Sequence, residues 1–229
     1  MAKSKKNQEF EKQDEQLQEV NEALTGAGKW IEDNSSLLSW IVLGIAIVVM
    51  ACIALNQYVI APKGLEASNE NAKAVFYFQQ GDFDKALNGD DAECIGFEAI
   101  ADQYGLFQQG KLAALYAGIC YFEKGEYEEA AKYLKKFSAK DLNIDPAAKQ
   151  MLGDAYVELG EYGKAASAFE AAANSGNELI APMSLKKAGI VYLHEGKKAK
   201  AKKAFERIKN EYQDSNEALD IDKYIAIAE

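Results

Sequence analysis

The sequence has little proline, histidine and cysteine, and each shortage excludes a class of protein. Its 229 residues include three prolines, one histidine and three cysteines. So little proline, beside abundant Ala, Glu, Lys and Leu, favours long helices over a β-sandwich. A single imidazole excludes most catalytic triads and most histidine-based metal sites. Three cysteines without a CxxC pair indicate neither a disulfide-stapled scaffold nor a zinc site.

Positive charge is also scarce, since 36 acidic residues outnumber 26 basic ones and give a net charge of −10. Nucleic-acid binding depends on clustered Lys and Arg that neutralise phosphates, so we predict no nucleic-acid partner. The sequence contains no GxSxG, no phosphate-cradling GxxxxGK[ST] and no HExxH. We therefore predict that the protein is not an enzyme and holds no cofactor and no metal.

One long apolar run lies near the amino terminus. Residues 37–55 carry no charge, and Ser39 is their one polar side chain. A helix of this length covers roughly 28 Å, close to the ~30 Å hydrocarbon thickness of a bilayer. Trp30, Trp40 and Tyr58 flank the run, where amphipathic rings favour the membrane interface. We predict a transmembrane helix over residues 37–60.

Pro62 follows this run and is expected to end the helix, because proline lacks a backbone donor and restricts the residue before it. A cleaved signal peptide fits poorly, since a leader of 36 residues with eight acids precedes the run. A lipoprotein cleaved before Cys52 fits poorly for the same reason. A buried core helix is the remaining alternative, but nothing else in the chain is apolar enough to surround it.

The tail over residues 1–36 has its own pattern, because Phe10, Leu17, Leu24 and Ile31 recur every seven residues. Such a stripe predicts an amphipathic helix that could pack against a partner helix or the membrane surface. A frayed, solvated tail is the open alternative, because three heptads are too few to establish a coiled coil.

Beyond Pro62 the chain repeats itself. Three segments share a tyrosine, a glycine four residues later, an alanine five residues further and then a bulky apolar residue. Their glycines, Gly125, Gly160 and Gly196, are 35 and 36 residues apart. A fourth, degenerate copy has its glycine at Gly81 and is stretched over residues 88–96, with its second helix expected at 97–104.

This pattern resembles the tetratricopeptide repeat (TPR), a helix–turn–helix unit of about 34 residues. The signature L-G-x2-Y…A-x3-F is carried by Leu152, Gly153, Tyr156, Ala165 and Phe169. The resemblance covers roughly residues 66–213. It implies close helix crossings at Gly118, Gly153 and Gly189, and left-handed corners at the turn glycines.

The predicted fold class is therefore all-α. One amino-terminal transmembrane helix is followed by a TPR solenoid of three to four helix pairs over residues 62–229. Stacked repeats need a terminal cap, and the amphipathic stretch after Asn216 is the candidate capping helix.

In a TPR array the first helices of each pair line a groove that binds protein segments. Carried over by position, the groove residues here are Asn71, Val75, Phe78, Leu115, Ile119, Phe122, Gln150, Asp154, Val157, Lys186, Ile190 and Leu193. The set is mainly apolar, so a hydrophobic segment or amphipathic helix is the expected ligand. Internal packing of these side chains is the equally open alternative.

Three smaller features have alternatives of their own. The lysine run at 197–203 is expected to be the solvated side of a helix, or a contact for anionic lipid or an acidic partner. Cys94 and Cys120 are expected to be free thiols, with a disulfide as the alternative. His194 is expected to lie at the surface.

The layout of tail, single span and TPR domain is similar to the ancillary SecYEG translocon subunit family. The lysine-rich, arginine-poor usage and the stretch LAALYAGI at residues 112–119 resemble the Bacteroidetes members of that family. That resemblance implies a single-pass bacterial inner-membrane protein with a cytoplasmic amino terminus and a periplasmic TPR domain. It implies translocon subunits, periplasmic chaperones or client polypeptides as partners. A homo-oligomeric envelope subunit and a cytosol-facing TPR receptor are the alternatives.

Overall fold

The structure, a computed structural model, describes residues 30, 33–90 and 94–229, and every regular element among them is helical. This confirms the predicted all-α class. Contacts divide the chain into two compact units, residues 1–61 and residues 62–229. The heptad stripe predicted for the tail lies outside the described residues.

In the first unit, helix α2 (Ser35–Leu55) has no buried residue. By length and composition it is able to cross a membrane. Helical structure continues through a π-turn, η1 (Asn56–Ile60), into α3 (Ala61–Gln79), so the prediction that Pro62 ends the helix is wrong. In the π-turn the Ala61 N–H donates to the Asn56 carbonyl, five residues back. The regular i−4 ladder is therefore already interrupted where proline removes a donor.

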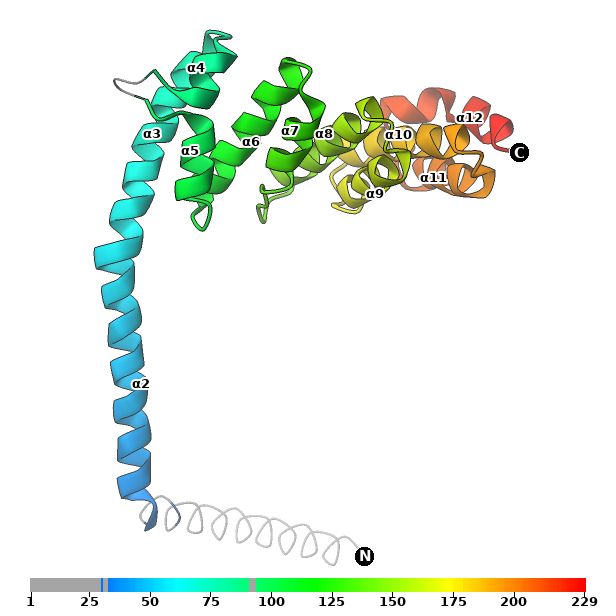
Figure 1. The fold of residues 1–229 in the computed structure, drawn as a ribbon. Helices are drawn as coiled ribbons and strands as arrows, with labels where there is room; N and C mark the ends of the chain where they lie inside the picture. The colour runs from blue at the N-terminus through cyan, green and yellow to red at the C-terminus, as the bar shows by residue number, and fades with distance from the viewer. Residues whose placement is uncertain (1–29, 31–32, 91–93) are drawn as a thin grey trace, which may run out of the picture. The chain divides into compact units, whose positions relative to one another are not determined.

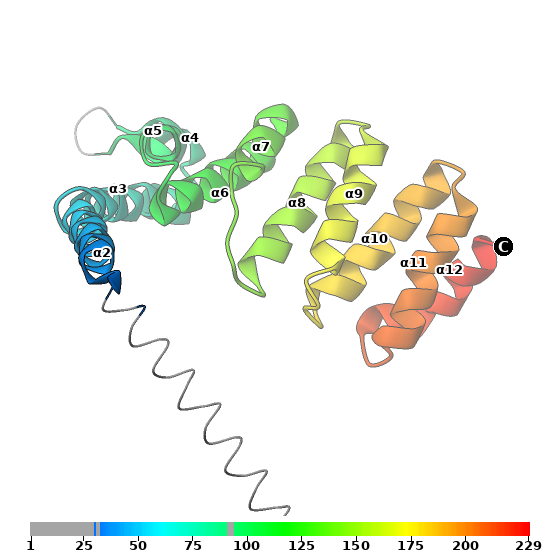
Figure 2. The same ribbon diagram turned by 90° about the horizontal axis from the view of Figure 1, so that it is seen from below.

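The second unit is a row of antiparallel helix pairs (Figures 1 and 2). The first helices of the pairs are α3, α6 (Gln108–Glu123), α8 (Ile144–Glu158) and α10 (Ile180–His194). The second helices are α4 (Phe83–Asn88) with α5 (Gly96–Gln103), α7 (Tyr127–Leu134), α9 (Tyr162–Ala173) and α11 (Lys198–Glu211).

Each pair turns at an equivalent glycine. Gly81, Gly125, Gly160 and Gly196 have φ of 75°, 77°, 70° and 71°, the left-handed region that an L side chain rarely adopts. At each corner the glycine N–H donates to the carbonyl three residues back, and the next N–H to the carbonyl five residues before it. This closes the end of the first helix. The predicted corners are confirmed, and the degenerate first copy is a fourth repeat.

The two helices of a pair cross where glycine was predicted. A Cβ added to Gly153 would lie 2.5 Å from the Phe169 ring, and one on Gly189 would lie 2.2 Å from the Phe205 ring. Both phenylalanines are fully buried. The missing Cβ therefore lets a bulky ring fill the crossing.

Polar contacts join successive repeats at the spacing of the repeat. Lys136 with Asp102, Ser184 with Gln150, and Lys187 with Asp154 bond across 34, 34 and 33 residues. Asn177 also bonds across 34 residues to Asn143. The first repeat is therefore bonded to the second and the third to the fourth, at offsets close to one repeat, which is the stacking expected of a solenoid.

The first repeat differs because an inserted loop splits its second helix into α4 and α5. Asp90 closes this loop, accepting from the Cys94 N–H at 2.9 Å and from the Tyr77 hydroxyl at 2.5 Å. Helix α5 begins at Gly96, one residue before the predicted start. It brings Phe97 into a stack with Tyr116, their ring centroids 5.1 Å apart.

The array ends in a 3₁₀ turn, η2 (Asn216–Asp220), and helix α12 (Ile221–Ile227). Ile221 is buried, and the Tyr224 ring centroid lies 5.4 Å from that of Phe205. Lys209 of α11 pairs with Asp222 at 2.6 Å. Helix α12 thus covers α11 as the predicted capping helix.

Candidate functional site

The predicted groove residues occupy three positions on each first helix, counted from the residue at the helix crossing (Ala74, Gly118, Gly153 or Gly189). Three residues before the crossing stand Asn71, Leu115, Gln150 and Lys186. One residue after it stand Val75, Ile119, Asp154 and Ile190. Four residues after it stand Phe78, Phe122, Val157 and Leu193. Positions i, i+4 and i+7 share one side of a helix, and we call this shared side the first-helix face.

At the α3 end of the first-helix face the predicted residues pack inside the unit. Asn71 is buried, and its Nδ2 donates to the Gln109 carbonyl at 2.8 Å. The ring centroid of Phe78 lies 5.2 Å from that of Tyr116. These side chains bond α3 to α6, so they hold the array together at this end.

Over α8 and α10 the polar residues of the first-helix face are all bonded to a neighbouring element. Asp154 pairs with Lys187 at 2.6 Å, and Gln150 accepts from the Ser184 hydroxyl at 3.3 Å. Lys186 pairs with Asp220 of η2 at 2.6 Å. A carboxylate ligand would therefore have to displace Asp220 to reach Lys186.

Of the remaining residues of the first-helix face, all apolar, Leu115 is buried and the others are partly accessible. Ile190 is 44% exposed, while Ile119, Phe122, Val157 and Leu193 are half-buried. Partly exposed apolar side chains at regular spacing along neighbouring helices can receive the apolar face of a bound segment. The accessible chemistry of this face is hydrophobic.

Two further residues belong to the first-helix face and were not predicted. Leu112 and Met183 stand six residues before Gly118 and Gly189, and both side chains are partly exposed. They continue the i, i+3, i+7, i+10 stripe by one step on α6 and α10. The repeat period carried the signal, because both residues occupy the same place in their repeats.

The buried cysteine and tyrosine side chains of the second unit have structural roles. Cys94 and Cys120 are free and buried, and burial raises the pKa of the Cys120 thiol to about 12. Burial, followed by the Glu170 carboxylate, raises the pKa of Tyr192 well above its usual value. The Tyr192 hydroxyl donates to Glu170 at 2.7 Å. These groups are held protonated, in the state that acts as a hydrogen-bond donor.

In the described part of the chain, no group of three or more His, Cys, Asp and Glu side chains could hold a metal ion. The exposed His194 packs on Tyr162, with ring centroids 4.2 Å apart. The lysine run is partly paired, since Lys197 bonds Glu195 at 2.9 Å and Lys202 bonds Glu229 at 2.7 Å.

A hollow of about 320 Å³ lies between α9 and α11, away from the first-helix face. It is lined by Glu170, Asn174, Leu185, Lys200, Lys203, Ala204 and Arg207. Arg207 is already bonded there to Asn174 at 2.9 Å and to Glu211 at 2.7 Å. The hollow is therefore separate from the predicted groove residues.

Residues 67–224, from the seventh residue of α3 into α12, match the family described as the N-terminal domain of EccA1, a protein of the ESX-1 type VII secretion system. The chain belongs to this family. No curated protein matches the sequence significantly. The family match covers the four repeats and most of the cap, and it ends ahead of the last residues of α12.

Solved structures share the TPR-like fold of this family member. A kinesin light chain of Podosopora anserina with nearly identical TPR-like repeats is 14% identical, with a TM-score of 0.51. The match covers 72% of this chain and 85% of that one. MamA is 22% identical over 68% of this chain and 91% of its own, with a TM-score of 0.48. The kinesin light chain likeness supports the TPR-like repeat fold, which is typical of protein–protein interaction scaffolds.

Proposed function

We propose that this protein is a membrane-anchored adaptor that binds an apolar segment of a partner polypeptide on its first-helix face. One observation carries the proposal. The polar residues of that face over α8 and α10 are bonded to neighbouring elements, whereas Ile119, Ile190 and their apolar neighbours keep accessible surface. The apolar helix α2 supports the anchor by its length and composition.

We place the adaptor at a site of protein export in the bacterial inner membrane. Two likenesses support this: the layout resembles ancillary subunits of the SecYEG translocon, and the family takes its name from a secretion-system protein. On this proposal the amino terminus is cytoplasmic, the array is periplasmic, and the bound segments come from translocon subunits, chaperones or exported clients.

Binding is tested with the full chain in detergent and a labelled amphipathic peptide that has leucines on one face and glutamines on the other. Ile190→Asp and Ile119→Asp each place a charge on the first-helix face and are expected to weaken binding. Glu206→Gln, on the exposed side of α11, is the matched control and should bind like the parent. Equal binding by all four proteins would refute the proposed site.

Topology is tested with single cysteines at Ser4, in the tail, and Ser138, in the α7–α8 connection. Cys52 is replaced by alanine, and Cys94 and Cys120 are buried and poorly reactive. A membrane-impermeant thiol reagent applied from the periplasmic side should label Ser138→Cys and leave Ser4→Cys unlabelled. The reverse result would favour the cytosol-facing receptor.

The homo-oligomeric alternative is separated by light scattering of the full chain. A monomer that binds the peptide supports the adaptor. An oligomer that does not bind the peptide supports the envelope assembly subunit instead.

A further inference from the structure

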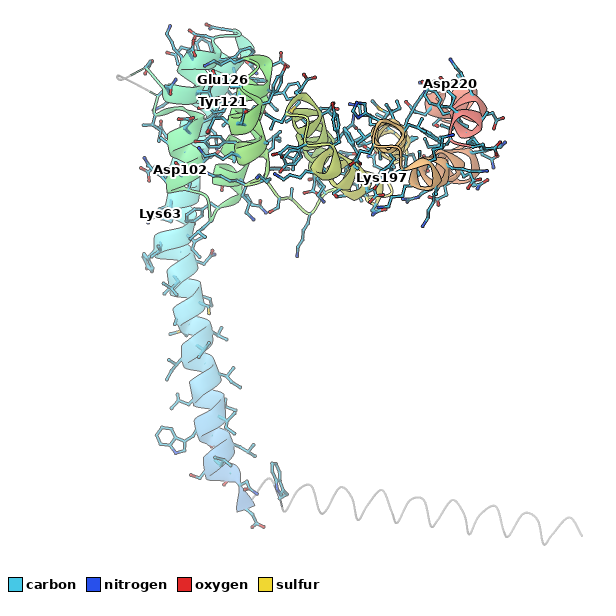
Figure 3. All side chains as sticks on the ribbon, turned by 45° about the vertical axis from the view of Figure 1, so that its right-hand side comes forward. Lys63, Asp102, Tyr121, Glu126, Lys197 and Asp220 are labelled. Atoms are coloured by element: carbon cyan, nitrogen blue, oxygen red, sulfur yellow. The ribbon has the colours of Figure 1, made fainter. Side chains whose placement is uncertain are left out.

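The edge of the array at which the first helices begin carries two exposed leucines at the α3 end. Leu106, in the turn between α5 and α6, is 96% exposed, and Leu65, in the second turn of α3, is 65% exposed. Figure 3 shows this edge at Lys63 and Asp102, with Glu126 at the opposite edge. Single exposed leucines are common on protein surfaces, so their setting decides whether they matter.

The turn that carries Leu106 is held in place by the backbone. The Phe107 N–H donates to the Tyr104 carbonyl at 2.8 Å. Gly110 lies so close to the same Tyr104 carbonyl that a Cβ on Gly110 would be 2.0 Å from the carbonyl oxygen. Leu106 therefore lies at the tip of a tightly closed turn, where its side chain is exposed.

The same turn is attached to the start of α3. Asn71 of α3 donates to the Gln109 carbonyl at 2.8 Å, and a Cβ on Gly64 would lie 3.7 Å from the Gln109 amide. Gly64 stands two residues after the beginning of the second unit at Pro62. In Figure 1 the α5–α6 turn lies at the end of the pair from which α3 begins. Leu106 and Leu65 therefore belong to one corner, which we call the α3 corner.

A short helical connection separates the α3 corner from the apolar run. Residues 56–65 are helical and add at most about 15 Å beyond Leu55. The polar layer of a bilayer leaflet is itself roughly 5–8 Å deep. Tyr58, Val59 and Ile60 continue the apolar character through part of this connection. If α2 spans the membrane, the α3 corner is tethered next to the lipid headgroups.

We propose that the α3 corner is a second membrane contact, in which Leu106 and Leu65 insert into the lipid interface. This inference rests on the membrane anchor of the proposed function. Leucine side chains partition favourably out of water, and a tethered corner needs no further loss of translational freedom to reach the bilayer. Two contacts, the span and the corner, restrict how the array is held above the membrane.

The experiment uses the full chain with Cys52→Ala, reconstituted in phosphatidylcholine vesicles that contain lipids with a quencher near the headgroup. An environment-sensitive fluorophore is attached at Leu106→Cys. The first control is Leu179→Cys, a leucine 71% exposed in the α9–α10 connection, the corresponding place two repeats further along. The second is Glu123→Cys, at the far end of α6, about 24 Å along the helix.

The fluorophore at Leu106→Cys should be blue-shifted and quenched by the lipids, while both controls should emit as in water. No quenching at Leu106→Cys would overturn the proposal, and so would equal quenching at Leu179→Cys. Crosslinking of this position to a protein in native membranes, without quenching in vesicles, would assign the corner to a protein partner instead.

Carbonate extraction of the same vesicles separates this inference from the proposed function. Protein that is released by carbonate lacks the anchor, and both proposals then fail. Protein that resists carbonate and binds the amphipathic peptide, but shows no quenching at Leu106→Cys, refutes the α3 corner alone.

Discussion

The first repeat and the fourth repeat build the same helix pair in different ways. The fourth places Gly189 at the helix crossing and fills the space with the Phe205 ring. The first has Ala74 at that position, an inserted loop, and a stack of Phe97 on Tyr116. Phe97 of α5 also lies against Phe78 of α3, with ring centroids 6.5 Å apart, and supplies aromatic packing inside the first pair without a glycine at the crossing. A repeat fold is therefore defined by its corner and crossing geometry, and the residues that fill the crossing are interchangeable.

The largest expected effect tests the first repeat. Phe97→Ala empties a fully buried site in the aromatic stack and should lower the free energy of unfolding by about 4 kcal/mol. Urea unfolding of the full chain in detergent, followed by circular dichroism, measures it. The control Phe76→Ala removes an exposed ring from the neighbouring helix and should change little. A cost for Phe97→Ala as small as the control's would mean that α5 does not hold the repeat.

The second prediction gives the fourth repeat the Cβ that the first repeat already has. Gly189→Ala should lower the free energy of unfolding by about 2 kcal/mol. Overpacking against Phe205 costs roughly 3 kcal/mol, and the higher helix propensity of alanine returns roughly 1 kcal/mol. Adding Phe205→Leu makes room for the new methyl group and should recover part of the loss. If the double variant loses more free energy of unfolding than the two single variants added together, the new methyl group does not act through the crossing.

The third prediction concerns the corners that all four repeats share. Gly160 has a φ of 70° and open space around it, so Gly160→Ala should cost about 1 kcal/mol from backbone strain alone. Gly163, three residues later, also has open space but lies in α9 without a positive φ. Gly163→Ala should stabilise by roughly 0.5–1 kcal/mol. The opposite signs of two neighbouring substitutions, read from thermal unfolding, isolate the effect of the corner.

The smallest effect concerns the contacts between repeats. The side chains of Lys187 and Asp154 are 36% and 32% exposed, so their coupling in a double-mutant cycle should be about 0.5 kcal/mol. Lys187→Met and Asp154→Asn provide the cycle, and added salt should reduce the coupling. A coupling well above this would mean that the pair, rather than the apolar crossings, holds neighbouring repeats together.

The regular repeats were predicted in detail because local constraints repeat with the sequence. A left-handed corner requires glycine, and a close crossing requires a small residue, so Gly160 and Gly153 are visible without coordinates. The prediction that Pro62 ends the helix was wrong because the π-turn before it already interrupts the i−4 hydrogen bonds, so the donor that proline lacks is not needed. No residue pattern predicts such a turn. The split of the first repeat was predicted from the residues that interrupt its pattern.

The sequence predicted which residues share one side of the first helices, but not which of those side chains are accessible. Equivalent positions follow from the period, so the twelve predicted groove residues lie on the first-helix face. Whether a side chain there is free depends on partners brought by a neighbouring element, as when Asp220 of η2 bonds Lys186. Such pairing depends on the angle between stacked helices and on side-chain reach, and a single repeat encodes neither. Leu112 and Met183 were within reach of the same period and were overlooked.

The order of the contacts along the array also determines how it would respond to force. A pull on the carboxy-terminal end would first strain the Lys209–Asp222 pair and the packing of α12. The bonds between α10 and α8 would come under load only afterwards. The array would then lengthen in steps, one hairpin at a time, instead of rupturing at once.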